Sequence, residues 1–352
     1  MKNIRNTFNE HLVNLKVPLK NCLLKLNELG ADAILFILDE NKKLIGSLTD
    51  GDVRRGILKG LNLEDEVVNF IQNNPRSIKR GNYDIHEIIK LREDGYKIIP
   101  VVDLDGVIVK VINFRFLKSY LPIDVVIMAG GRGERLRPLT DIIPKPLLKV
   151  GAKPIIEHNI DRLINYGIDD FWISIRYLGD QIINYIGDGA KQNVKIKYIA
   201  EDSPLGTIGS VSLVNQYEHD YVLVTNSDIL TNLDYEQFFL DFINSNSDFS
   251  VATIPYNVNV PYAILNTIDN KITNFKEKPT YTYYANAGIY LMKKSIIDKI
   301  PKNTMYNATD LLENLLDNNF NVTSFPLRGY WLDIGKHDDY KKANDDIKFI
   351  NF

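Results

Sequence analysis

Residues 123–151, IDVVIMAGGRGERLRPLTDIIPKPLLKVG, constrain this chain more than any other stretch. They open with an apolar run at residues 125–128, which predicts a buried strand. The loop that follows contains Ala129, Gly130, Gly131 and Gly133. Glycines allow several backbone N–H groups to point toward one anion. At the carboxyl edge of a parallel sheet, such a loop predicts a phosphate-binding cradle.

Two cations accompany this loop. Arg135 supplies a planar guanidinium that can bind two phosphate oxygens at once, and Lys145 supplies a point charge between Pro144 and Pro146. A Walker A loop would need Gly-Lys-Ser/Thr, and a dinucleotide-binding fingerprint would need a third glycine near Leu136; the sequence has neither. The alternative is a Gly-rich turn without a ligand, which the length of the pattern disfavours.

The pattern GGxGxRLxPLT followed by PKPL resembles the signature of the sugar-1-phosphate nucleotidyltransferases. The resemblance implies a mostly parallel α/β domain, Rossmann-like and GT-A-like, over residues 122–352. It also implies that Arg135 and Lys145 are catalytic and contact the nucleotide together with the glycine loop. Expected helices at residues 154–166 and 178–186 alternate with expected strands, which favours the same fold class.

Later motifs match the same family in order. An expected strand at residues 221–225 ends near Asp228, and an acid at the end of a central strand points into the ligand crevice. By resemblance, Asp228 is a catalytic metal ligand and Asp333, in WLDIG, a second ligand for Mg²⁺, the expected cofactor. Gly206 and Thr207, in LGT, resemble the segment that closes over the nucleobase. Alone, each would be interpreted as an ordinary turn or helix start.

Two further motifs resemble the part of the family site that binds the sugar phosphate. In FKEKP, Lys278 matches the lysine that holds the phosphate and Glu277 would face the sugar hydroxyls. In NAGIY, Asn286 and Gly288 match residues near the sugar ring. A lone Lys-Glu-Lys is more often a solvated charged face, so the order of the motifs carries this interpretation.

The first part of the chain contains a repeat. Residues 23–40 are similar to residues 88–103, and each copy predicts helix, strand, turn, strand and helix. This order resembles a tandem CBS-domain pair, which we assign to residues 1–121. Such a module implies homo-oligomer formation or adenosine-nucleotide sensing.

One adenosine nucleotide is the most that we expect this module to bind. In GSLTDGDVRRGI, Thr49 and Asp52 match contacts to a ribose, but they could equally cap a helix. In the second copy, Asn113 and Phe116 occupy these positions and offer no equivalent contacts.

Composition excludes several classes of protein. The net charge of −3 gives no electrostatic indication of a nucleic-acid partner, and the single cysteine excludes an internal disulfide framework. No apolar run approaches a membrane span, and the start lacks an apolar signal core. We therefore expect a cytoplasmic enzyme without a membrane partner. Since few residues follow the WLDIG motif, the resemblance also leads us to expect no left-handed β-helix tail of the kind that some family members carry.

The available side chains fit nucleotidyl transfer. The motifs supply glycines, cations and separated aspartates, and a sugar 1-phosphate is already an anion that needs no base. The residues of the RLRPLT and PKPL motifs are most similar to those of family members that use GTP and mannose-like sugars. Uridylyl-, thymidylyl- and cytidylyl-transferases remain alternatives, as do a transferase acting on a non-sugar phosphate and a catalytically inactive nucleotide-sensing protein.

Overall fold

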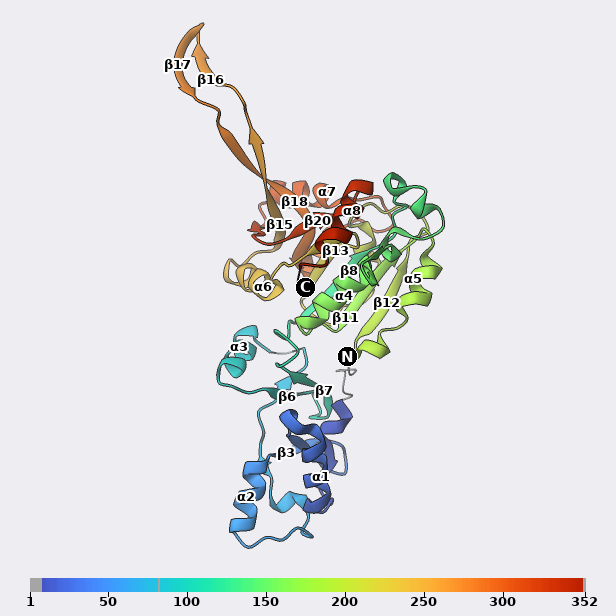
Figure 1. The fold of residues 1–352 in the computed structure, drawn as a ribbon, viewed down its shortest axis with the longest axis vertical. Helices are drawn as coiled ribbons and strands as arrows, with labels where there is room; N and C mark the ends of the chain where they lie inside the picture. The colour runs from blue at the N-terminus through green and yellow to red at the C-terminus, as the bar shows by residue number, and fades with distance from the viewer. Residues whose placement is uncertain (1–7, 82, 351–352) are drawn as a thin grey trace. The chain divides into compact units, whose positions relative to one another are not determined.

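The computed structural model describes residues 8–81 and 83–350. The chain forms two compact units (Figure 1). Unit 1 comprises Met1–Pro122 with Ile164–Asp169 and Gly189–Val194, and unit 2 comprises Ile123–Leu163, Asp170–Asp188 and Lys195–Phe352. Among the helices of the described residues, none has the length and apolar content that a bilayer crossing requires.

The described residues of unit 1 form two small sheets. The first has the order β1 (Leu12–Asn14), β2 (Leu35–Leu38), β3 (Leu44–Leu48) and β4 (Gln72–Asn73). The second has the order β5 (Ile78–Lys79), β6 (Ile98–Val102) and β7 (Ile108–Asn113). Its helices are α1 (Leu19–Leu29), α2 (Asp50–Leu58) and α3 (Ile85–Glu93). Phe36 of β2 packs with Ile98, Val102 and Ile108 of the other sheet, so the two halves of the repeat share a core.

The second half of the repeat lacks its closing helix, so our expectation of a helix there is wrong. The first half runs α1, β2, β3, α2, whereas the second runs α3, β6, β7 and then has no helix before residue 123. The side chain of Asn113 accepts a hydrogen bond from Arg115 N at 3.0 Å, and Phe116 N and Leu117 N bond to the Asn113 carbonyl at 3.0 Å. Asparagine favours such turns over helix continuation, and Pro122 follows a few residues later.

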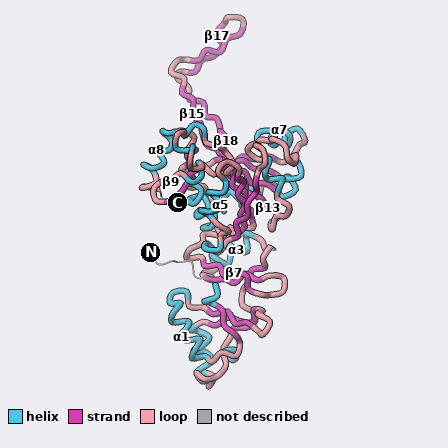
Figure 2. The backbone as a smooth tube through the Cα atoms, turned by 90° about the vertical axis from the view of Figure 1, so that its right-hand side faces the viewer, coloured by secondary structure: helices cyan, strands magenta, loops and turns pink. Residues whose placement is uncertain are grey.

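Unit 2 is built on a seven-stranded sheet with the order β12-β11-β8-β13-β18-β15-β19. Figure 2 shows β13, β15 and β18 of this sheet. The strands are β8 (Ile123–Met128), β11 (Asp170–Ile175), β12 (Lys195–Ala200), β13 (Tyr221–Asn226), β15 (Phe249–Asn259), β18 (Thr280–Lys293) and β19 (Val322–Pro326). Only β18 runs antiparallel to its neighbours. The α/β class with a mostly parallel central sheet is therefore confirmed.

Five α-helices lie wholly or mainly in unit 2 in the described residues: α4 (Ile155–Asn165), α5 (Gly179–Ile186), α6 (Tyr235–Asn244), α7 (Ala308–Asp317) and α8 (His337–Asp346). α4 and α5 confirm the helices that we expected at residues 154–166 and 178–186, whereas α6 and α8 were not predicted. Leu311 and Leu315 of α7 pack with Val126, Val222 and Val224 on one face of the sheet. This apolar core fixes the positions of β8 and β13.

The strand order reverses between β8 and β13. The chain runs from β8 outward to β11 and β12, then returns to place β13 on the other side of β8. Both strands end at the same edge, where Ser227 N donates to Met128 O at 3.1 Å. Ligands of open α/β sheets bind at this kind of reversal, outside the carboxyl ends of the strands.

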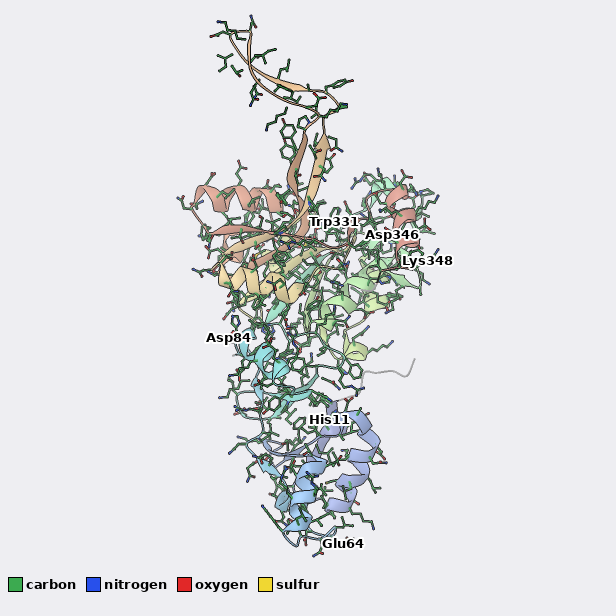
Figure 3. The ribbon with its side chains drawn as sticks, turned by 60° about the vertical axis from the view of Figure 1, so that its left-hand side comes forward. His11, Glu64, Asp84, Trp331, Asp346 and Lys348 are labelled. Atoms are coloured by element: carbon green, nitrogen blue, oxygen red, sulfur yellow. The ribbon has the colours of Figure 1, made fainter. Side chains whose placement is uncertain are left out.

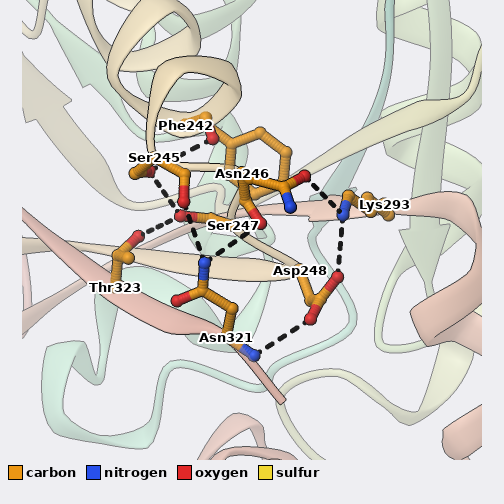
Figure 4. A network of polar contacts seen from close by, with 8 residues as sticks. All are labelled: Phe242, Ser245, Asn246, Ser247, Asp248, Lys293, Asn321 and Thr323. Carbon is orange, nitrogen blue, oxygen red and sulfur yellow. Dashed lines mark hydrogen bonds and ion pairs between the residues drawn. The ribbon is translucent and has the colours of Figure 1, made fainter.

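The amino ends of β15 and β19 are joined by a polar network to the carboxyl end of β18 (Figure 4). Lys293 of β18 donates to Asp248 Oδ1 at 2.8 Å, and Asn321 N donates to Asp248 Oδ2 at 2.9 Å. Desolvation acts to raise the pKa of Asp248, but the bonds from Lys293 and Asn321 outweigh it and hold the pKa below its ordinary value. Ser247 and Thr323 are bonded through their hydroxyls at 2.7 Å. These contacts hold the three strands together far from the strand reversal.

Residues 254–286 form an arm that extends β15 and β18 beyond the sheet (Figure 1). Its outer part is the two-stranded pair β16 (Ile264–Ile268) and β17 (Lys271–Lys276). At the base of the arm, Trp331 Nε1 donates to Ala287 O at 2.9 Å (Figure 3). This bond connects β18 to β20 (Trp331–Asp333), a short strand that pairs with β14 (Ile229–Thr231).

Candidate active site

A cavity of about 580 Å³ opens at the carboxyl ends of β8, β11 and β13 in unit 2. Eight residues that the sequence predicted for a nucleotide or metal site line it: Gly130, Gly131, Gly133, Arg135, Lys145, Gly206, Thr207 and Asp228. Residues up to 98 positions apart in the chain are thus gathered at the strand reversal. Ala129, which the sequence also predicted for the nucleotide site, is buried and does not line the cavity. Its N–H donates to Ser174 O at 2.9 Å.

Lys145 and Asp228 form an ion pair at the floor of the cavity. Lys145 is only 9% exposed, and its ammonium donates to Oδ2 of Asp228. Oδ1 of the same carboxylate is buried and has no hydrogen-bond partner among the described residues. A buried carboxylate oxygen without a partner is costly unless a cation or donor occupies the space beside it.

Asp333 lies beside this pair. β20 runs antiparallel to β14, with Asp333 opposite Ile229, and Ile334 N donates to the carbonyl of Asp228 at 3.0 Å. Burial raises the pKa of Asp333, and the charge of Asp228 adds to the rise, although Lys145 and Arg135 oppose it. Two adjoining carboxylates, one with an unused oxygen, form a donor set that suits a hard divalent cation.

Gly133 shapes the glycine loop around Lys145. Its φ of 66° is left-handed, and a Cβ built there would lie 3.0 Å from the Lys145 Cβ and 3.1 Å from Thr140 Cγ2. The Thr140 hydroxyl donates to Gly133 O at 2.9 Å and fixes this turn. Only glycine fits here without displacing the lysine stem.

The Arg135 guanidinium is available to a ligand. Arg135 follows Gly133 in a short 3-10 turn, Glu134–Leu136, which the fully buried Leu136 anchors. A Cβ built on Gly335 would lie 3.4 Å from two guanidinium nitrogens. Within the described ranges the guanidinium makes no hydrogen bond or ion pair, so its five donors can face phosphate oxygens.

Gly206 and Thr207 close another side of the cavity. Gly206 has a φ of 76°, and a Cβ there would lie 2.6 Å from Tyr306 O. The Thr207 hydroxyl accepts a hydrogen bond from Ala308 N, the first residue of α7, at 2.9 Å. The side chain of Thr207 therefore stabilises the start of α7, and both Gly206 and Thr207 line the cavity.

Arg176, Glu201 and Asn226 also line the cavity, and sequence reasoning missed them. Each lies at or just after the end of a strand, which is the signal that could have identified them. Glu201 accepts hydrogen bonds from the Ser174 hydroxyl and from Leu205 N, so it holds the LGT segment near the glycine loop. A Cβ on Gly130 would lie 3.1 Å from Glu201 Oε1.

The residues predicted for the sugar phosphate are not gathered at this cavity. Glu277 and Lys278 lie on the arm with exposed side chains. Asn286 uses its amide within β18, accepting from Gly288 N at 2.8 Å and donating to the Tyr290 hydroxyl at 2.9 Å. Gly288 comes nearest to the site, because a Cβ there would lie 2.7 Å from Asn226 Nδ2. The roles of these four residues stay predictions.

In unit 1, Thr49 and Asp52 form the capping box of α2. Asp52 Oδ2 accepts from Thr49 N at 2.8 Å and from the Thr49 hydroxyl at 2.6 Å, and Oδ1 is ion-paired with Arg55. Helix capping is thus the role that the structure shows for this pair. Nucleotide binding there stays a prediction.

Known proteins are similar to unit 2 in sequence and in fold. The family described as nucleotidyl transferase matches residues 124–349. The chain belongs to the nucleotidyl transferase family. The match spans the glycine loop, Lys145, Asp228 and Asp333, and so it covers the whole cavity described above.

Two curated relatives show the range of names in this nucleotidyl transferase family. The bifunctional protein GlmU of Methanococcus maripaludis is 32% identical over 245 residues, covering 65% of this chain and 54% of that protein. The mannose-1-phosphate guanylyltransferase of Mycobacterium tuberculosis is 29% identical over 232 residues, covering 64% of each chain. The chain thus spans between half and two thirds of the length of these relatives.

A solved structure matches as well. HddC from Yersinia pseudotuberculosis superimposes with a TM-score of 0.51 at 29% sequence identity, covering 64% of this chain and 99% of that one. The nucleotidyl transferase fold therefore accounts for about two thirds of the chain.

Proposed function

We propose that this chain transfers a nucleoside monophosphate from a nucleoside triphosphate to a sugar 1-phosphate, releasing pyrophosphate. The observation that carries this proposal is the ion pair between Lys145 and Oδ2 of Asp228 beside the glycine loop. The other oxygen of the Asp228 carboxylate, Oδ1, is buried without a partner among the described residues. A binding module for a neutral ligand would not need a buried cation and two adjacent carboxylates at a phosphate cradle.

For this reaction the protein needs mainly to align the two substrates and to neutralise the negative charge of their phosphates. An oxygen of the sugar phosphate attacks the α-phosphorus, the bond to the β-phosphate oxygen breaks, and pyrophosphate leaves with the electron pair. The N–H groups of Gly130, Gly131 and Gly133, together with Arg135, would hold the leaving pyrophosphate. Lys145 would contact the α-phosphate, where negative charge must be stabilised as the bonds change.

Asp228 and Asp333 would hold the Mg²⁺ ion, which would neutralise phosphate charge and help to orient the triphosphate.

For the nucleotide we propose GTP and for the acceptor a mannose-like sugar 1-phosphate. A mannose-1-phosphate guanylyltransferase among the relatives supports this choice, as does the sequence of the RLRPLT and PKPL motifs. Nothing in the cavity geometry discriminates guanine from uracil, thymine or cytosine, so these remain the alternatives. A panel of four nucleoside triphosphates and several sugar 1-phosphates, with pyrophosphate release as the readout, tests the proposal.

For the sugar phosphate we propose contacts from Lys278, Glu277, Asn286 and Gly288, on the strength of the motif order alone. In this structure the two charged residues would have to approach the cavity from the arm. A Lys278→Ala variant tests this part separately: it should raise KM for the sugar 1-phosphate while leaving KM for the triphosphate near its starting value.

We propose that residues 1–121 form a CBS-domain pair and that residues 122–352 form the catalytic domain. The repeated helix-strand-strand order of unit 1 and its shared core support the first assignment. We expect at most one adenosine nucleotide per chain, at the segment that contains Thr49 and Asp52. Calorimetric titration of the full chain with AMP and ATP tests this, with Asp52→Ala as the comparison; two sites per chain would contradict it.

A further inference from the structure

The arm, residues 254–286, has one polar and one apolar face along its inner half. Tyr256 lies opposite Tyr283, and Val258 lies opposite Tyr281, so these four side chains share a face. On the other face, Thr282 donates to Asn257 Oδ1 and Thr280 donates to Asn259 Oδ1, each at 2.8 Å. Strands that alternate in this way are built to bury one face and to leave the other in water.

The apolar face of the arm is nevertheless uncovered. Tyr256 and Tyr283 are 61% and 60% exposed. Farther out, Leu265 lies opposite Phe275, and these side chains are 52% and 62% exposed. Figure 3 shows the side chains of the outer arm standing away from the rest of unit 2. An isolated two-stranded ribbon is marginally stable in water, so an arm of this length needs a surface to pack against.

We propose that the arm docks on the arm of a second copy of this chain. Apart from Tyr284 on the opposite face, four aromatic side chains of the arm are between 60 and 73% exposed: Tyr256, Tyr262, Phe275 and Tyr283. Aromatic side chains can bury roughly 150–250 Å² each, so these four offer about 500 Å². Exposed aliphatic side chains on the arm add to this area, and one side of a stable protein interface buries about 800 Å².

The charge of the arm favours a copy of the same chain over other partners. Its charged residues are Asp269, Lys271, Lys276, Glu277 and Lys278. This near balance of signs offers no single-sign surface that would select a nucleic acid or a strongly charged protein. Aromatic enrichment with few charges is typical of interface cores. A two-fold contact, moreover, lets each arm cover the apolar face of the other, which doubles the buried area without a third component.

Sedimentation equilibrium of the full chain tests this inference. We expect the wild-type protein to be a dimer of the 40.3 kDa chain at micromolar concentration. The double variant Tyr256→Ser/Tyr283→Ser should weaken the dimer about 100-fold or more, because two aromatic anchors are lost. The matched control is Asn257→Ser/Thr282→Ala, the neighbouring cross-strand pair on the polar face, which should assemble as the wild type does.

Three outcomes would contradict the inference. The wild type could stay monomeric at every concentration, as it would if the arm folded onto its own chain. The tyrosine variant could assemble as well as its control, as it would if self-association ran through unit 1 alone. Amide hydrogen exchange of the wild type gives a reading that does not depend on the variants folding: protection of residues 254–286 should rise with protein concentration, and concentration-independent exchange contradicts the proposal.

Discussion

The ammonium of Lys145 donates to Oδ2 of Asp228, while Oδ1 of the same carboxylate is buried without a partner in the parts of the chain that the structure describes. The lysine therefore neutralises only one side of the carboxylate. The other oxygen is buried, and the charges of Asp228 and Arg135 both act on the neighbouring Asp333 carboxylate. This asymmetry is what a metal ligand requires before its ion arrives, and the first prediction tests it.

Asp228→Asn should lower Mg²⁺-dependent turnover by orders of magnitude, because the amide loses the charge that attracts the ion and leaves Lys145 unpaired. Asp333→Asn should have a similar or milder effect. Direct titration with Mn²⁺, followed by electron paramagnetic resonance, should show weaker binding in both variants. Wild-type affinity for Mn²⁺ in both would remove these aspartates from the metal site.

Arg135→Ala should reduce turnover about 100- to 1,000-fold, the usual cost of one lost contact to developing charge. Thermal unfolding should be unchanged, because the guanidinium has no bonding partner among the described residues. Arg137→Ala is the matched control: Arg137 is mostly exposed, pairs with Asp141 at 2.8 Å and does not line the cavity. Equal rates for the two variants would show that Arg135 has no special role.

Gly133→Ala should destabilise the fold by about 1–2 kcal/mol, the cost of a Cβ in the left-handed region, and should also displace Lys145. Gly131→Ala is the control, since Gly131 has no positive φ and no atom within 4 Å of its Cβ position. Urea unfolding compares the two. A Gly133 variant as stable and active as the Gly131 variant would mean that the loop can relax without loss.

Burial raises the pKa of Asp124 from 3.8 to about 6, although a hydrogen bond from His219 N at 2.7 Å partly offsets the rise. The folded state therefore holds a proton that the unfolded chain releases. The protonated Asp124 carboxyl therefore adds to the free energy of unfolding in full below pH 3.8, and this contribution is lost as the pH rises to about 6. The change in the free energy of unfolding is about 3 kcal/mol.

Urea unfolding at several pH values measures this loss. The stability of Asp124→Asn relative to wild type should rise between pH 4 and 6 and then level off. Asp220→Asn is the control, because the Asp220 side chain is 87% exposed. A parallel pH dependence in Asp124→Asn and wild type would refute the assignment to Asp124.

The sequence predicts the parts of unit 2 whose fold is determined locally. The apolar runs of β8 and β13 place their following loops at one sheet edge, because parallel strands with right-handed crossovers leave few alternatives. This was enough to predict that Arg135, Lys145 and Asp228 lie at one site. Asp333 could be placed only by resemblance, since its strand β20 has three residues and no periodicity of its own.

Other features depend on contacts that no local pattern records. α8 has charged residues over most of its length, so it lacks the apolar stripe that identifies a helix. The extension of β15 and β18 into an arm was missed because strands separated by a turn give the same pattern whether or not they leave the body of the protein. Lys278, which we predicted to hold the sugar's phosphate, lies on this arm, and its role stays a prediction.

The most direct test of the central claim is ³¹P NMR of the purified full chain with Mg²⁺, GTP and mannose 1-phosphate. The account predicts one pyrophosphate and one nucleotide-linked sugar phosphate per triphosphate consumed, with both signals absent for Asp228→Asn. Should another triphosphate or sugar 1-phosphate give the same pair of products, the reaction class would stand and the substrates would be reassigned. Release of orthophosphate alone, or no reaction with any of four triphosphates across the sugar panel, would contradict the account.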